Sequence, residues 1–157
     1  MTEETLILRH PKLVSLYAHW LELGGGGLPL AATLDPAALR PWLGNLLVID
    51  VRQGDDFVYS YYGQGLADAF GVDKVGQSIT TLPEPQLDIL HAEYDRVRTG
   101  KRPVARVYTA DFDGSVSSWE RLVMPLSDDG DGVSKILVGA YRLERPSVVA
   151  MGAPRTP

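Results

Sequence analysis

Apolar residues near the start of the chain recur at the spacing of an amphipathic helix over residues 9–23. They fall at i, i+3, i+4, i+7 and i+8 and are Leu13, Leu16, Tyr17, Trp20 and Leu21. Pro11 suits the first turn of such a helix, and the four glycines at 24–27 are expected to end it. Such a stripe must be buried, either against the rest of the chain or against a second copy.

Farther along, five segments have the length and alternation of β-strands: 45–52, 57–62, 102–112, 118–126 and 133–143. A short helix over 66–70 and a long helix over 84–99 separate the second strand from the third. Asp35 followed by Pro36 predicts the start of another short helix, which would run to about Leu43.

This order of elements predicts an α+β fold: a five-stranded antiparallel sheet with short helices and one long helix on one face. The amphipathic N-terminal helix is the candidate to cover the other face. We expect three parts: an N-terminal helix and glycine linker over 1–27, the folded domain over 28–144, and a tail over 145–157. The tail is expected to be disordered, because it carries three prolines and no periodicity.

Composition excludes several function classes. The 157 residues carry a formal charge of −5 and no run of basic residues, so a nucleic-acid partner is not expected. The absence of cysteine excludes disulfides, thiolate catalysis and cysteine-based zinc sites. No apolar run is long enough to span a membrane. A cytoplasmic location is the expectation.

Two blocks carry a resemblance to a known family. The first comprises Phe57, Tyr59, Ser60, Gly63 and Gln64, followed by Gly71 and Gly76; the second is the run ERLVMPLS at 120–127, before an Asp/Gly turn. Their order resembles a PAS domain over about residues 10–143, and more narrowly the stand-alone PAS proteins of alphaproteobacteria. Ser60 and Gln64 stand where that subgroup usually has arginine and threonine, which puts any role of those two positions in doubt.

The resemblance implies a cytoplasmic sensor or signalling adaptor that binds a small ligand, a protein partner or both, with no catalysis of its own. No nucleophile, base and orienting group are spaced as an enzyme would need. Homodimerisation through the stripe of the first helix is expected. One alternative is a ligand-free homodimeric interaction module. Another is a small cone-shaped isomerase or dehydratase, which would pair His91 with Asp50 or Asp111.

A ligand pocket would draw on aromatic residues with polar tips and on the few polar residues of the predicted inner face. The candidates are Tyr59, Tyr61, Phe70, His91, Tyr94, Tyr108 and Arg121. Alternation places Trp119, Arg121 and Val123 on one face of their strand and Glu120, Leu122 and Met124 on the other. An inward Arg121 would receive a carboxylate or phosphate ligand. The interpretation that we favour is a structural salt bridge or a solvated sheet face.

The sequence leaves the cofactor open. In haem-binding PAS domains a histidine of the corresponding helix ligates the iron, which would be His91 here, but a histidine at the edge of the core is the preferred interpretation. The cysteinyl-flavin photochemistry of light-sensing PAS domains is excluded because the chain has no cysteine. The acidic turn at 128–132 lacks the ligand spacing of a calcium loop, so no metal site is expected.

Overall fold

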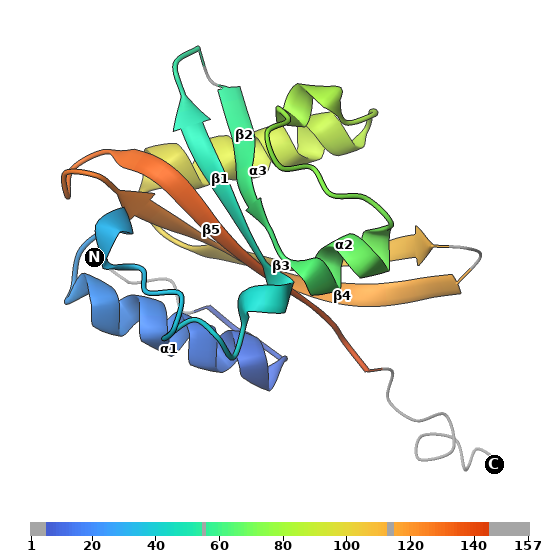
Figure 1. Ribbon diagram of the computed structural model, residues 1–157, viewed down its shortest axis with the longest axis horizontal. Helices are drawn as coiled ribbons and strands as arrows, with labels where there is room; N and C mark the ends of the chain where they lie inside the picture. Colours follow the sequence, from blue (N-terminus) through green and yellow to red (C-terminus); the bar gives the residue numbers. More distant parts are fainter. Residues whose placement is uncertain (1–5, 55, 113–114, 145–157) are drawn as a thin grey trace.

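A computed structural model describes residues 6–54, 56–112 and 115–144 of the chain. These residues form one antiparallel sheet of five strands in the order β2-β1-β5-β4-β3 (Figure 1). The strands are β1 (Leu46–Arg52), β2 (Asp56–Tyr62), β3 (Val104–Phe112), β4 (Ser115–Ser127) and β5 (Val133–Arg142). The helices are α1 (Pro11–Gly24), α2 (Gln64–Phe70) and α3 (Gln86–Gly100). The predicted α+β architecture is confirmed.

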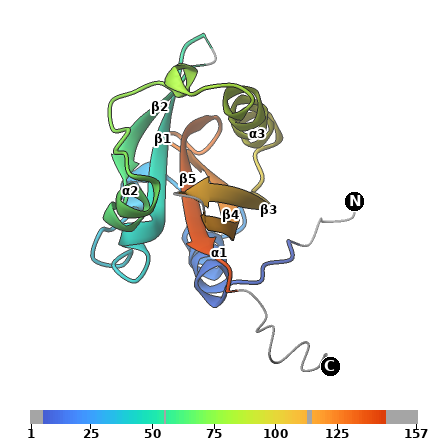
Figure 2. The ribbon, with the colours of Figure 1, turned by 90° about the vertical axis from the view of Figure 1, so that its right-hand side faces the viewer.

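The sheet separates two hydrophobic clusters, because alternate residues of each strand point to opposite faces. On one face, Phe57 and Ile136 pack against Tyr94 and Val97 of α3. On the other face, residues of β4 and β5 pack against α1. Accordingly, α1 and α3 lie on opposite sides of the strands, as Figure 2 shows from the side. The predicted division of β4 is confirmed, with Trp119 and Val123 in the first cluster and Leu122 and Met124 in the second.

Helix α1 lies close to the sheet because Gly139 of β5 has no side chain. A Cβ at that position would stand 2.6 Å from Cδ2 of Leu16 and 2.9 Å from Cδ2 of Leu13. The indole Nε1 of Trp20 donates a 2.9 Å hydrogen bond to the carbonyl oxygen of Pro125 in β4. Gly25 then takes a left-handed conformation with φ of 56° and ends the helix, as predicted.

The stripe of α1 is therefore buried within its own chain. Leu13, Leu16 and Trp20 contact the sheet, whereas Tyr17 is half-buried and Leu21 is 48% exposed. The predicted cover for the second face of the sheet is confirmed. While α1 stays docked, a second chain can reach only its outer face. The need to bury the whole stripe is therefore no longer an argument for dimerisation. Homodimerisation itself stays a prediction.

The short helix predicted from Asp35 to Leu43 is wrong. The amide of Ala37 does bond to the Asp35 side chain at 3.0 Å, and the amide of Leu39 bonds to the Asp35 carbonyl at 2.9 Å. The segment then continues as turns and a 3₁₀ turn at Leu43–Asn45. Pro41 accounts for the difference, because it lacks the amide hydrogen that a continuing helix requires.

The other predicted elements agree with the structure to within a few residues at their ends. The predicted tail lies outside the described residues. No helix in the described part of the chain combines the length and apolar character needed to cross a membrane. The proposed division at residue 27 stays a prediction, although α1 contributes to the same core as the strands.

Candidate functional site

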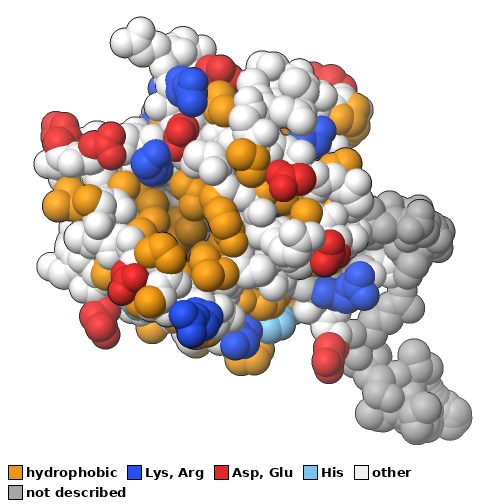
Figure 3. All heavy atoms as spheres, in the orientation of Figure 1, with side chains coloured by type: hydrophobic (Ala, Val, Ile, Leu, Met, Phe, Trp, Pro, Cys, Tyr) orange, Lys and Arg blue, Asp and Glu red, His pale blue; other side chains and the backbone are white. Residues whose placement is uncertain are grey.

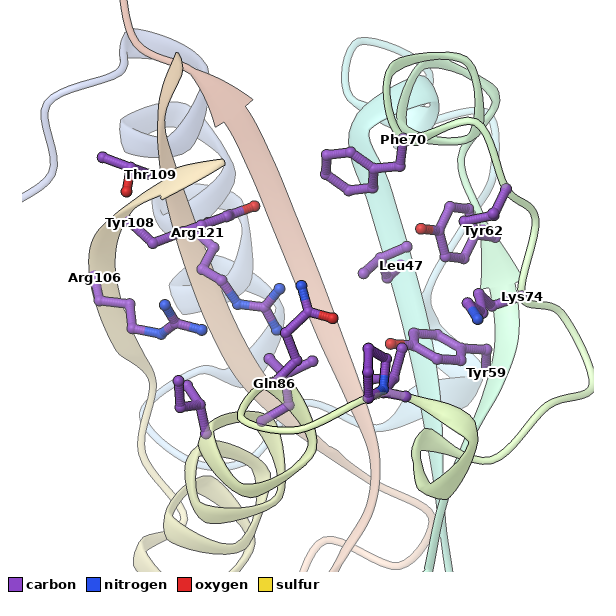
Figure 4. A pocket seen from close by; sticks show the side chains of 15 residues that line it. Leu47, Tyr59, Tyr62, Phe70, Lys74, Gln86, Arg106, Tyr108, Thr109 and Arg121 are labelled. Atoms are coloured by element: carbon purple, nitrogen blue, oxygen red, sulfur yellow. The ribbon is translucent and has the colours of Figure 1, made fainter. Parts of the chain in front are cut away.

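A cavity of about 480 Å³ opens between the sheet, α3 and the segment that joins α2 to α3 (Figure 4). Its volume lies within the ~300–1,000 Å³ typical of small-molecule sites. Two walls face one another, one from β3 and β4 and one from β1, β2 and α2, and α3 closes the end. The lining side chains are Leu47, Tyr59, Tyr62, Phe70, Val72, Lys74, Leu82, Pro83, Gln86, Ile89, Leu90, Arg106, Tyr108, Thr109 and Arg121.

The wall from β3 and β4 is basic and is held in place by one buried carboxylate. Nε of Arg121 donates to Oε1 of Glu93 in α3 at 2.8 Å, and Nε of Arg106 donates to Oε2 of the same group. The side chains of Arg121 and Glu93 are each only 7% exposed. Glu93 therefore orients two guanidinium groups side by side at the edge of the cavity.

Tyr94 of α3 is a further partner of Arg121 in this hydrogen-bond network. Nη2 of Arg121 donates a 2.7 Å hydrogen bond to the Tyr94 hydroxyl, and the guanidinium lies 5.6 Å from the centre of the Tyr94 ring. Burial alone would raise the pKa of Glu93, but the charge of Arg121 and the hydrogen bond from Arg106 lower that pKa below its usual value. Glu93 is therefore ionised at neutral pH and compensates one of the two arginine charges.

The hydroxyl groups around the cavity remain protonated at neutral pH. Burial raises the pKa of Tyr62 to about 12, and it also raises the pKa of Tyr59 and of Tyr108. Each of these phenols can therefore donate a hydrogen bond as well as accept one. Figure 4 shows the hydroxyls of Tyr59 and Tyr62 pointing into the cavity from β2.

The aromatic wall depends on an irregularity in β2 that the sequence pattern did not reveal. Ile49 pairs with Tyr59, but Val48 pairs with Tyr61, so Ser60 is an extra residue in β2. The bulge places Tyr59 and Tyr62 on the same side of the sheet. Tyr61 points to the α1 side, where its hydroxyl donates to the Leu43 carbonyl at 2.9 Å.

Helix α2 supplies Phe70 to the same wall, and its position is set by glycines. A Cβ at Gly63 would stand 2.5 Å from the carbonyl oxygen of Gly44, and one at Gly65 would stand 2.8 Å from that atom. These glycines thus allow two backbone segments to touch. The close approach explains why glycines stand at positions 63 and 65.

Four of the seven predicted pocket residues line the cavity: Tyr59, Phe70, Tyr108 and Arg121. Tyr94 lies beneath it as the hydrogen-bond partner of Arg121. Tyr61 and His91 do not line this cavity, because the bulge turns Tyr61 away and the His91 ring packs edge-on against Phe57 at 5.5 Å between centroids. Of the two interpretations favoured for Arg121, the structure has the salt bridge, with Glu93 as its partner, and not the solvated sheet face, because the Arg121 side chain is buried.

Sequence reasoning missed Glu93, Arg106, Tyr62 and Gln86. Helical spacing could have found two of them, because Gln86, Leu90 and Glu93 lie on one stripe of α3. Alternation could have found Arg106, which shares a strand face with Tyr108. Tyr62 had no such signal, since only the bulge brings it into the cavity.

On the opposite face, Glu120 fastens the segment that leads into α1. Its Oε1 accepts hydrogen bonds from the amides of Arg9 at 3.0 Å and His10 at 2.7 Å, and its Oε2 accepts another from Arg9 at 2.8 Å. Glu120 and Arg121 are adjacent in β4 and project to opposite faces of the sheet. The cavity and the attachment of α1 are therefore joined by a single peptide unit of β4.

The described residues argue against haem ligation by His91 and against an acid–base pair of His91 with Asp50. His91 does not line the cavity, so it is not placed to ligate a haem iron there. Asp50 accepts a 2.6 Å hydrogen bond from Lys135 and lies on the α1 side, since its neighbours Ile49 and Val51 pack on the α3 side. It cannot act together with His91. The structure does not describe the side chain of Asp111, so its pairing with His91 stays a prediction. Among the described residues no group of three or more acidic or histidine side chains is placed to hold a metal ion.

Comparison with protein families identifies the fold. The sequence matches the family described as "PAS domain" over residues 8–141. The chain belongs to this family. PAS domains are typically sensory rather than catalytic. The narrower placement among stand-alone alphaproteobacterial proteins stays a prediction. A search among curated proteins finds no match to the sequence.

Solved structures agree with the PAS assignment. A light-oxygen-voltage domain studied with a flavin analogue is 17% identical, with a TM-score of 0.53 over 76% of this chain and 91% of that chain. The PAS domain of Bordetella pertussis BvgS is 14% identical, with a TM-score of 0.53 over 89% and 94% of the two chains. VqmA from Vibrio cholera, in complex with ligand and DNA, is 16% identical, with a TM-score of 0.56 over 77% and 55%. Identities this low show the shared fold alone.

Proposed function

We propose that this PAS domain is a cytoplasmic sensory or signalling module that binds a small molecule in the cavity beside α3 and has no catalytic activity of its own. Its output would be a changed interaction with a protein partner. The observation that carries the proposal is the cavity of about 480 Å³, in which oriented polar groups face an apolar wall. Flavin and ligand appear in the names of two structural relatives, which supports a binding role for this fold.

Signal output through the N-terminal helix is supported by the arrangement in β4. A ligand that contacts Arg121 would act on the strand residue directly beside Glu120, whose carboxylate holds the amides of Arg9 and His10. A small rotation or shift of β4 would change both sets of contacts together. The partner-binding surface would then be the outer side of α1 and the chain segment that precedes it.

Native mass spectrometry and an absorbance spectrum of freshly purified protein test the binding role. We expect an additional mass that is released on denaturation. In a Leu90→Trp variant the larger indole would take up part of the ligand space, because Leu90 lines the cavity, and the additional mass should be lost. A Leu21→Trp variant adds the same side chain on the exposed face of α1 and should retain it. An additional mass that is equal in both variants would contradict the proposal.

A ligand-free homodimeric module is the second candidate, and one observation favours it: Val14 and Leu21 leave apolar surface on the outer face of α1, at 50% and 48% exposure. Light scattering after size exclusion distinguishes the candidates. A dimer that Leu21→Asp dissociates, together with the absence of any bound mass, would support the second candidate. A monomer that carries a bound mass would exclude it.

A further inference from the structure

The side chains that line the cavity carry an excess of positive charge. Lys74, Arg106 and Arg121 line it, and none of the described lining residues is acidic. The chain as a whole has the opposite balance, with 20 acidic and 15 basic residues. The lining therefore departs in sign from the rest of the molecule. On the face drawn in Figure 3, by contrast, basic side chains stand among acidic ones.

One carboxylate partly compensates this charge from behind the wall. Glu93 accepts one Nε–H from each arginine, and Tyr94 accepts from Nη2 of Arg121. A guanidinium group has five N–H donors, so both arginines retain donors for another partner. Glu93 thus leaves a net positive charge and keeps both forks oriented before any ligand arrives, which lowers the ordering cost of binding.

The remaining polar groups of the cavity also favour an acceptor-rich ligand. The phenols of Tyr59, Tyr62 and Tyr108 are protonated at neutral pH because burial raises the pKa of each. The amide of Gln86 reaches the middle of the cavity in Figure 4. A cationic ligand would face a net positive charge, whereas an anion would find charged and neutral donors converging on it.

The opposite wall selects for an apolar body on the ligand. Phe70 and Leu47 face the arginines across the cavity in Figure 4. Leu90 of α3 and Leu82 of the segment before α3 add further apolar surface. Inorganic phosphate would satisfy the basic wall but would leave this apolar surface uncovered. An aromatic ring could stack against Phe70 and Tyr62 while its substituent reached the arginines.

We infer that the cavity binds a small organic carboxylate with an aromatic or similarly flat apolar body. The carboxylate lies against the free N–H groups of Arg106 and Arg121, and the body lies against Phe70, Tyr62 and Leu47. This inference rests on the proposed small-molecule function of the cavity and adds the chemical class of the ligand.

Titration calorimetry with four probes tests the ligand class: benzoate, its neutral isostere benzamide, the cation benzylammonium, and inorganic phosphate. We expect benzoate to bind about ten- to hundredfold more tightly than benzamide, because a hydrogen bond to a charged partner is lost in the amide. Phosphate should bind more weakly than benzoate, and benzylammonium should not bind. Benzamide or phosphate binding as tightly as benzoate would overturn the inference.

Variants locate the charge that selects the ligand. Arg106→Gln should weaken benzoate binding at least about tenfold and leave benzamide unchanged. Its side chain is 32% exposed and Glu93 keeps Arg121 as a partner, so the variant should fold. Arg52→Gln removes the same charge at a 59% exposed position that does not line the cavity, and it should change neither affinity. Equal losses in the two variants would overturn the inference.

The Leu90→Trp variant separates the two levels of the argument. If benzamide binds as tightly as benzoate and Leu90→Trp abolishes both, the ligand class is wrong and the binding function stands. If none of the four probes binds and Leu90→Trp changes nothing in the native mass spectrum, the ligand class and the binding function both fail.

Discussion

Replacing Gly63 by alanine tests how the glycines position the aromatic wall of the cavity. Gly63 has φ of −62° and ψ of 141°, which any residue adopts, so the substitution causes no backbone strain of its own. The new Cβ would instead stand 2.5 Å from the carbonyl oxygen of Gly44 and 2.7 Å from that of Leu43. Ordinary contact begins at 3.4 Å, so the two backbone segments would have to separate by about 0.9 Å.

Backbone atoms cannot escape such a contact by changing rotamer, so the cost should lie near the upper end for overpacking, at about 3 kcal/mol. For a chain of this size that corresponds to a loss of roughly 6–12 °C in Tm. Because α2 begins at the next residue, the shift would also move Phe70 and weaken ligand binding at the cavity.

Thermal unfolding followed by circular dichroism measures the effect, with Gly100→Ala as the matched control. A Cβ at Gly100, the last residue of α3, meets no heavy atom within 4 Å, so alanine there should be neutral or stabilising by up to about 1 kcal/mol. A Gly63→Ala protein that unfolds at the same temperature as the wild type would refute the close-approach argument.

Three further predictions follow from the polar contacts. Glu93→Gln should destabilise the fold by about 3 kcal/mol in urea titrations at pH 7, because it leaves buried Arg121 without its counterion. Folding lowers the pKa of Glu93, so its contribution to stability is fully present above the unfolded pKa of ~4.3 and is lost as the pH falls through the folded pKa. The difference in stability between variant and wild type should therefore shrink in acid. Wild-type stability should also fall as pH rises from ~10 toward about 12, because the folded state raises the pKa of Tyr62, as it does for Tyr59 and Tyr108, and the unfolded chain ionises first. A Tyr62→Phe variant should lose less stability over this range, and an undiminished loss would argue against the contribution of Tyr62. Glu120→Gln should speed hydrogen exchange at the amides of Arg9 and His10 at least about tenfold relative to Asp129→Asn, a carboxylate change in an exposed turn, and unchanged protection would refute the anchoring role.

The salt bridge of Arg121 shows what strand alternation predicts and what it does not. The positions of Arg121 and Glu120 on opposite faces of β4 follow from their adjacency alone, and the structure confirms both. Their partners, Glu93 in α3 and the amides before α1, lie 28 and about 110 residues away in the chain. No local pattern contains contacts of that separation.

The sequence by itself determined the order and type of nearly all elements, because hydrophobic period, glycine and proline act within a few residues of where they stand. It also indicated that the apolar stripe of α1 must be buried against another surface. It further indicated much of the aromatic content of the pocket. Only the tertiary structure decided which aromatic side chains reach the cavity, since the extra residue at Ser60 exchanges Tyr61 for Tyr62. It also decided the charge of the site, because α3 must dock on the sheet before Glu93 can hold two arginines together.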